Sequence, residues 1–212
     1  MTADEVADFE RCIAAGGVGL FPADTVYGLA VDPGSRSAVE RVYAIKDRPA
    51  AKPAAVMFSD VSRALGALDW LGQRTRAALE RLLPGPVTVV VANPDARFAL
   101  ACGPETSRLG VRVPRLDGPL EPLAALGMPL LQTSANRSGG ADPRSLPEVD
   151  PRIRGAVDVE LDGGELPGVP STVIDLSAHD ADGGWRLLRE GALTVSEVES
   201  ALGSPPTEPV TG

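Results

Sequence analysis

Residues 44–57 read AIKDRPAAKPAAVM and place three cations, Lys46, Arg48 and Lys52, within seven residues. Arg48 and Lys52 each stand directly before a proline, and a residue in that position is directed away from helix toward extended backbone. The stretch therefore predicts an ordered loop that presents positive charge between a helix and a buried strand. Its spacing alone favours a solvated basic turn, because a short basic cluster is a weak motif.

The use of lysine sets this stretch apart from the rest of the chain. Of the 20 basic residues, 18 are arginine, and both lysines lie in this stretch. A lysine ammonium is a compact point charge, whereas an arginine guanidinium is a planar fork. The pattern therefore indicates a site that needs a compact ammonium.

Length, composition and charge limit the possible protein classes. The chain has 212 residues, of which 43% are hydrophobic, and a formal net charge of -9. These values predict one domain over residues 1–203 and a disordered, proline-rich tail over residues 204–212. The acidic balance argues against broad neutralisation of nucleic-acid phosphates, so any anion site must be local.

The sequence also lacks the signals of a membrane or secreted protein. Its longest apolar runs are too short to span a bilayer, and the acidic start MTADEVADFE is no signal peptide. We therefore expect a soluble cytoplasmic protein that makes no membrane contact.

The cysteines and the histidine give no sign of a metal site. Cys12 and Cys102 are far apart and have no CxxC partner, so they are expected to be small apolar residues. His179 lies in the polar segment SAHDADGG, which predicts a surface loop. No disulfide, no histidine-based triad and no metal-ligating side chain is therefore predicted.

The hydrophobic pattern alternates between helical and strand-like segments, which predicts an α/β fold. Helices are expected over residues 4–15, 35–45, 61–68, 73–83, 120–126 and 194–202, and strands over 18–21, 54–58, 87–92, 109–114, 129–132, 157–161, 171–176 and 185–188.

Polar side chains follow several of the expected strands, where open α/β sheets bind ligands. Asp24 and Thr25 follow the first strand, and Arg112 interrupts an apolar strand, where a guanidinium is costly to bury unless it meets an anion. Segment 133–140, TSANRSGG, brings hydroxyls, an amide and two glycines after a strand and could cradle a phosphate. Each feature has an ordinary alternative: a turn, a strand face open to water, or a plain polar loop.

Seven segments together resemble the motifs of the YrdC-like threonylcarbamoyl-AMP synthases: FPADTVYGLAVDP, AIKDRPAAKP, LLPGPVT, LGVRVP, LLQTSANRSG, PSTVIDL and LLREGAL. The resemblance covers roughly residues 5–200, and its KxR, SxN and STV elements are specific as a set. It implies the short form of this family: a single-domain, twisted mixed sheet with flanking helices and a concave basic cavity.

The resemblance also implies an activity and its partners. The enzyme would join L-threonine, bicarbonate and ATP, with Mg²⁺ accompanying the ATP, to give threonylcarbamoyl-adenylate and pyrophosphate. Proteins of a threonylcarbamoyl-transfer complex would receive the product and modify tRNA, which is itself a candidate partner. Two alternatives stay open: a carbamoyl-adenylate-forming enzyme and an RNA-binding module, against which the net charge of -9 counts.

The resemblance assigns site residues position by position. Lys46 and Arg48 are the expected catalytic residues, and the chemistry would come from positioning and electrostatics. Arg48, Lys52, Ser134, Asn136 and Arg189 are assigned to ATP, and Thr25, Arg112 and Ser171 to L-threonine. The chain departs from the family pattern at Ala23, Asp47, Met57 and Asp142.

Overall fold

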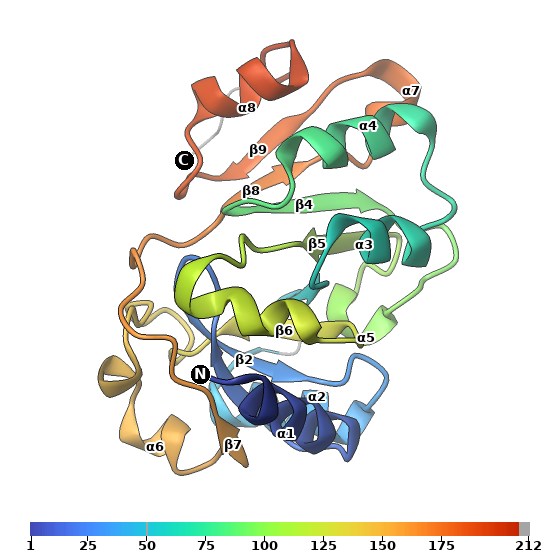
Figure 1. The fold of residues 1–212 in the computed structure, drawn as a ribbon. Coiled ribbons are helices and arrows are strands. Elements are labelled where there is room, and N and C mark those ends of the chain that lie inside the picture. Colours follow the sequence, from blue (N-terminus) through green and yellow to red (C-terminus); the bar gives the residue numbers. More distant parts are fainter. Residues whose placement is uncertain (50, 208–212) are drawn as a thin grey trace.

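One mixed sheet carries the fold in the computed structural model, which describes residues 1–49 and 51–207 (Figure 1). In these residues the strands are β1 (Gly19–Pro22), β2 (Tyr27–Val31), β3 (Ala55–Met57), β4 (Val87–Ala92), β5 (Arg108–Arg112), β6 (Leu130–Ser134), β7 (Val159–Glu160), β8 (Thr172–Asp175) and β9 (Arg186–Arg189). They are ordered β7-β1-β2-β6-β3-β5-β4-β8-β9. The pairs β1–β7, β3–β5 and β4–β8 are parallel and the other neighbours are antiparallel, which confirms the predicted mixed sheet.

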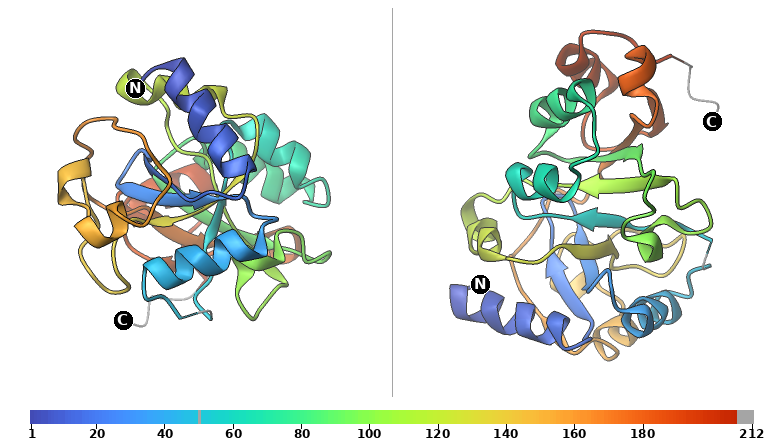
Figure 2. Two further views of the ribbon diagram at one scale, coloured as in Figure 1. Left: turned by 90° about the horizontal axis from the view of Figure 1, so that it is seen from below. Right: turned by 90° about the vertical axis from the view of Figure 1, so that its right-hand side faces the viewer.

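Helices cover both faces of this sheet. The helical segments are α1 (Ala3–Ala14), α2 (Arg36–Ile45), α3 (Val61–Ala67), α4 (Gln73–Leu82), α5 (Ala99–Cys102), the 3₁₀ segments η1 (Gly118–Ala125) and η2 (Leu146–Glu148), α6 (Pro151–Arg154), α7 (His179–Asp182) and α8 (Val195–Leu202). Figure 2 shows α1, η1, α3 and α4 on one side of the sheet and α2 and α5 on the other. Within the described ranges, every helix is too short or too polar to cross a membrane.

The first helix shows how local sequence sets an element. In α1, Val6, Phe9 and Ile13 recur at helical spacing and are buried. Thr2 caps its N-terminus, and Glu5 bonds back to the cap backbone, which together form a capping box. The predicted opening helix is therefore confirmed.

A tight turn ends α2 and sets the course of the cationic stretch. The N–H of Asp47 donates to Ala44 O at 3.1 Å and that of Arg48 to Tyr43 O at 2.9 Å, the two bonds of a Schellman motif. Asp47 adopts a left-handed backbone with φ of 51°, which glycine favours. The turn leaves Lys46 buried and Arg48 half-buried.

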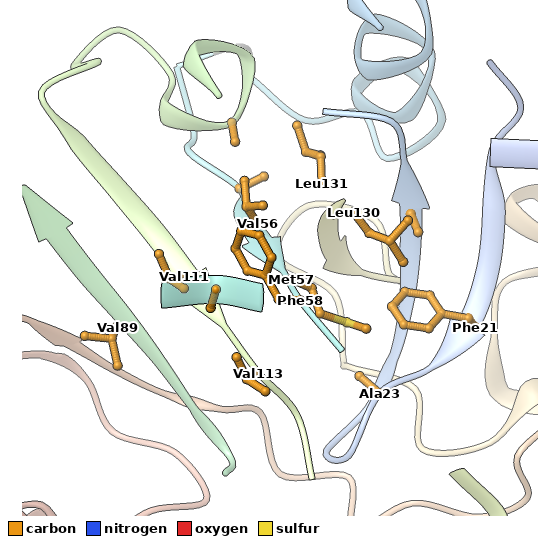
Figure 3. Close-up of a cluster of buried hydrophobic side chains, with 14 of the residues drawn as sticks. Phe21, Ala23, Val56, Met57, Phe58, Val89, Val111, Val113, Leu130 and Leu131 are labelled. Carbon is orange, nitrogen blue, oxygen red and sulfur yellow. The ribbon is translucent and has the colours of Figure 1, made fainter. Parts of the chain in front are cut away.

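The hydrophobic core lies between the sheet and the covering helices. Figure 3 shows Phe21, Val56, Phe58 and Leu130 gathered in one cluster, and Met57 is buried there as well. Val56 pairs with Leu131 and Met57 with Leu130 across β3 and β6, so the two pairs contribute to opposite faces of the sheet, because strand residues alternate.

Strand β4 is only partly as predicted. Val87, Val89 and Val91 are buried, but the alternate residues Thr88 and Val90 are half-buried and face a cavity. The charge-free apolar run over residues 87–92 predicts a buried strand, and this prediction is wrong for one face. An apolar run reads the same whether its second face meets a helix or a binding cavity.

Short elements account for other differences. The segment around His179 is not a surface loop but the helix α7, in which the buried imidazole contacts Gly184 O through Nδ1 at 3.0 Å. One turn of helix has too few residues for a periodic signal. In the predicted tail, Thr207 donates from its N–H to Trp185 O at 2.8 Å, and residues 208–212 lie outside the described residues.

Replacing Asp47 tests the left-handed turn. We expect Asp47→Ala to be about 1 kcal/mol less stable than Asp47→Gly, because a Cβ is unfavourable at positive φ. Both variants lose the exposed ion pair with Arg137, so the comparison isolates the backbone term. Urea unfolding measures the difference, and equal stability of the two variants would contradict the turn geometry.

Candidate functional site

A cavity of about 400 Å³ lies over the central strands. Its walls come from β4, β5, β6, β8 and β9, from the loop after α2 and from the segment after α5. The charged lining residues are Arg48, Arg108, Arg112, Arg189, Glu105 and Asp142. The charged part of the lining therefore consists of four arginines and two carboxylates.

Arg112 is a buried residue of the cavity lining. Its side chain is 4% exposed, and Nη2 donates to the carboxylate of Asp24 and, at 2.6 Å, to Thr25 Oγ1. Asp24 is fixed in turn because it accepts from the N–H of Arg115 at 3.0 Å. The arginine thus meets an anion supplied by the chain itself, while its Nε has no partner among the described residues.

Lys46 lies behind the cavity wall and is 1% exposed. Its Nζ donates to Ser134 O, to Asn136 O at 2.6 Å and to Asn136 Oδ1 at 3.0 Å. An ammonium has three protons, so these three acceptors use all of them. Lys46 therefore holds the segment after β6 in place.

The surroundings of Lys46 disfavour its charge. Burial, together with the nearby positive charges of Arg48 and Lys52, lowers the pKa of Lys46 to about 7. The carboxylate of Asp142 opposes this shift. The ammonium is thus held by hydrogen bonds while its pKa lies within the physiological range.

The segment after β6 is tied to the end of α2 in both directions. The N–H of Ser138 donates to Lys46 O at 2.9 Å, and Lys52 Nζ donates to Ser138 Oγ at 3.2 Å. Ser134 Oγ donates to Asn136 Oδ1 at 2.7 Å. Loop and helix end therefore form one polar unit beside the cavity.

The guanidinium of Arg48 is held by a hydrogen bond and by a contact with an aromatic ring. Its Nη2 donates to Pro53 O at 2.6 Å, and its guanidinium lies 5.6 Å from the ring centre of Tyr43. The Tyr43 hydroxyl donates to Lys52 O at 2.7 Å, which fixes the ring. The guanidinium is thus oriented before any ligand binds.

Ser171 and Arg189 meet in another part of the cavity lining. Arg189 Nη2 donates to Ser171 O at 2.6 Å, and the hydroxyls of Ser171 and Thr88 lie 3.0 Å apart. Gly191 lets the chain after β9 pass this wall, because a Cβ there would lie 2.3 Å from Pro170 O. A larger residue at position 191 would push Ser171 and Arg189 apart.

The structure brings the predicted site residues together in two layers. Those that line the cavity are Arg48, Arg112, Ser134, Ser171 and Arg189. Lys46, Asn136 and Thr25 stand behind lining residues and bond to them. Lys52 lies between Ala51 and Pro53, which both line the cavity.

Sequence reasoning missed several lining residues. Arg108 precedes Arg112 by four positions on the same strand, so period-two alternation places both on one face. Glu105 comes from the segment after α5, a helix that the pattern did not predict. Cys102 lies at the wall as a buried thiol whose pKa is raised by burial, in keeping with the apolar role expected for it.

A metal ion at this site would need coordinating atoms from a bound ligand in addition to those of the protein. Among the described residues, no group of three or more His, Cys, Asp or Glu could hold an ion. Asp142 and the hydroxyl of Ser134 do line the cavity, and such oxygen donors suit Mg²⁺. The site therefore fits an Mg²⁺ ion that arrives with a phosphate ligand, because Mg²⁺ is usually held by one or two carboxylates and substrate phosphates.

Sequence comparison matches this chain to one family model and to relatives that share one name. The family model Sua5_yciO_yrdC, which carries the description "Telomere recombination", matches residues 11–191. A Pyrococcus abyssi relative named threonylcarbamoyl-AMP synthase is 30% identical over 194 residues, which cover 90% of this chain and 55% of the relative. A relative of the same name from Chromohalobacter salexigens is 35% identical over 183 residues, covering 84% of this chain and 96% of the relative.

The fold comparison agrees with the sequence comparison. The crystal structure of P. abyssi Sua5 complexed with L-threonine superposes with a TM-score of 0.83 at 28% identity, over 97% of this chain and 59% of that one. The chain thus spans little more than half of the longer curated relatives that it matches and nearly all of a shorter one.

The lowered pKa of Lys46 can be measured directly, because a lysine-labelled protein shows signals from Lys46 and Lys52 only. We expect one ¹⁵N or ¹³Cε NMR signal to titrate near pH 7, with the ammonium charged below that value and neutral above it. Lys46→Arg should remove this signal and Lys52→Arg should keep it. Titration of the Lys46 signal only near the ordinary lysine value of about 10.4 would contradict the prediction.

The lowered pKa of Lys46 also makes the free energy of unfolding depend on pH. Because the pKa of Lys46 is lower in the folded chain than in an unfolded one, the unfolded state binds more protons between the two values. Lys46 therefore makes the free energy of unfolding rise with pH from about 7 to about 10.

Proposed function

The chain belongs to the Sua5/YciO/YrdC family, and from this membership we propose that it is a threonylcarbamoyl-AMP synthase. One observation carries the proposal: residues that the sequence assigned to ATP or L-threonine from widely separated segments line the same cavity. They are Arg48, Arg112, Ser134, Ser171 and Arg189. The substrates would be L-threonine, bicarbonate and ATP.

The reaction proceeds in two steps that need no nucleophilic side chain. The threonine amine attacks bicarbonate, a C–N bond forms and water leaves, which gives a carbamate. A carbamate oxygen then attacks the α-phosphorus of ATP, a P–O bond forms, and the bond to the β-phosphate breaks to release pyrophosphate. The nucleophile comes from the substrate, so the protein contributes positioning and charge stabilisation.

The nucleotide would bind between the loop after α2 and the segment after β6. Arg48 is already oriented there by Pro53 and Tyr43, and Ser134 lines the same cavity. Negative charge increases on the phosphate oxygens during the attack, and a preoriented guanidinium stabilises it without reorganisation. Lys46 serves this step by holding Ser134 and Asn136 in position. Mg²⁺, when bound with the ATP, neutralises phosphate charge.

L-threonine would bind beside Arg112. The guanidinium of Arg112 is held at Nη2 by Asp24 and Thr25, and its Nε has no partner among the described residues. A substrate carboxylate can accept from the remaining donors of this guanidinium. The Ser171 hydroxyl lines the same cavity and can bond to a polar group of the amino acid.

The product determines the expected partners. An acyl-adenylate is a reactive mixed anhydride, so a threonylcarbamoyl-transfer complex would take it over and carry the group to tRNA. We place this activity in the cytoplasm, where tRNA and ATP are both available. The net charge of -9 disfavours a broad RNA-binding surface on this chain itself.

The decisive experiment detects the adenylate by mass spectrometry. The purified protein, incubated with ATP, Mg²⁺, L-threonine and bicarbonate, should form threonylcarbamoyl-adenylate and release pyrophosphate, and omission of any substrate should abolish the product. Pyrophosphate release with carbamoyl phosphate in place of threonine would instead show a carbamoyl-adenylate-forming enzyme. Salt-sensitive tRNA retention without turnover would show an RNA-binding module.

Variants of two basic residues test the proposed ATP site. We expect Arg48→Ala and Lys52→Ala each to weaken ATP binding by about 1 to 3 kcal/mol, because each removes a charge-assisted contact. Calorimetry measures the change. Arg36→Ala is the control, since Arg36 is exposed at the opposite end of α2 and should leave ATP affinity unchanged. Wild-type affinity in both test variants would remove these two residues from the site.

A further inference from the structure

Asp142 is a carboxylate without a hydrogen-bond or ion-pair partner among the described residues, in a cavity whose other charged lining residues are four arginines and Glu105. It is half-buried and lines the cavity, yet in residues 1–49 and 51–207 its carboxylate makes no hydrogen bond and no ion pair. The other acidic residue of the cavity differs. Glu105 is exposed, accepts from the Ser107 hydroxyl at 3.3 Å and lies 3.9 Å from Arg108.

The backbone on both sides of Asp142 is fixed. Asn136 Nδ2 donates to Gly140 O, and the N–H of Gly140 donates to Arg137 O at 2.8 Å. On the other side, the N–H of Tyr27 donates to Pro143 O at 2.9 Å. The backbone position of Asp142 is thus fixed on both sides, while its two carboxylate oxygens stay available to a ligand.

Two cations that feel the charge of Asp142 each have hydrogen-bond partners of their own. Its charge acts on Lys46 and on Arg189, and it favours the charged form of both. However, the ammonium of Lys46 is used by Ser134 and Asn136, and Arg189 Nη2 donates to Ser171 O. The negative charge of Asp142 therefore stays available to a cation that enters the cavity.

The proposed substrate makes such a cation necessary. A triphosphate brings several negative charges close to this carboxylate, and like charges repel strongly where water is partly excluded. An ion between the two relieves the repulsion. Mg²⁺ suits the position, because it binds through one or two carboxylates together with substrate phosphates and keeps several waters.

We propose that Asp142 is the protein's carboxylate ligand for the Mg²⁺ that accompanies ATP. The proposal rests on the proposed function, because the phosphates of the nucleotide complete the coordination. It gives Asp142 a role in metal binding, in contrast to Lys46, which positions the neighbouring loop. It also explains why a cavity for a polyanion contains an unpaired carboxylate.

Neutralising the carboxylate at constant shape tests the proposal. ATP binding to wild type, Asp142→Asn and Glu105→Gln is measured by calorimetry, once with Mg²⁺ and once with EDTA. We expect Mg²⁺ to strengthen ATP binding to wild type and to Glu105→Gln. In Asp142→Asn this enhancement should fall by about tenfold or more, the scale of a lost charged contact, while affinity in EDTA stays the same or increases.

Replacing Asp142 is expected to change ATP affinity differently with Mg²⁺ and with EDTA, and this difference separates the possible roles of Asp142. If the carboxylate only repels phosphate, Asp142→Asn tightens ATP binding equally with Mg²⁺ and with EDTA. If it is only structural, binding weakens equally in both. Either result overturns the proposal. Circular dichroism checks that the variant is folded, which we expect because the carboxylate makes no bond within the described chain.

A spectroscopic readout supports the binding data. Mn²⁺ replaces Mg²⁺, and the electron paramagnetic resonance spectrum of the complex of protein, Mn²⁺ and ATP is compared between wild type and Asp142→Asn. A changed spectrum in Asp142→Asn and an unchanged one in Glu105→Gln are expected. Wild type that binds no ATP would refute the proposed function itself, whereas normal ATP binding with an intact metal effect in Asp142→Asn would refute this inference alone.

Discussion

The structure depends on the buried ammonium of Lys46. It joins the end of α2 to the segment after β6, which is nearly 90 residues further along the chain, through three oxygens of Ser134 and Asn136. A buried amino group is costly unless it is hydrogen-bonded, so this contact disfavours other arrangements of the two segments, although burial also disfavours its charged form. Three oxygens around one point suit an ammonium, whereas a planar guanidinium would need a wider arrangement. This geometry explains why a chain rich in arginine has a lysine here.

The same principle recurs around the cavity, where each cation is held by groups of the protein. Arg112 is held by Asp24 and Thr25, and Arg189 by the backbone of Ser171. These contacts restrict the guanidinium groups before a ligand arrives. Electrostatic stabilisation is most effective when the charged groups need not reorganise during the reaction. The guanidinium groups of the cavity are thus fixed in place by the protein itself.

Much of this arrangement could be predicted from the sequence, and the failures have physical reasons. The caps and apolar spacing of α1 are local signals, and so is the proline-flanked cationic loop. The neighbours of β3, by contrast, are β5 and β6, and nothing local specifies such pairs. The partner of Arg112 was missed for the same reason, because Asp24 meets it only after the strands assemble. Arg108 could have been predicted, since strand alternation alone places it on the same face of the sheet as Arg112.

The charge distribution bears on the choice between a small substrate and RNA. The chain carries a net charge of -9, yet four arginines line one cavity of about 400 Å³. An extended polyanion would have to cross the acidic surface along its length, and that surface repels it. A small anion needs only to enter the cavity, where the low dielectric strengthens its attraction to fixed cations. Local positive charge within an acidic body therefore favours the binding of a nucleotide over that of RNA, and the physical reason is the size of the ligand rather than its chemistry.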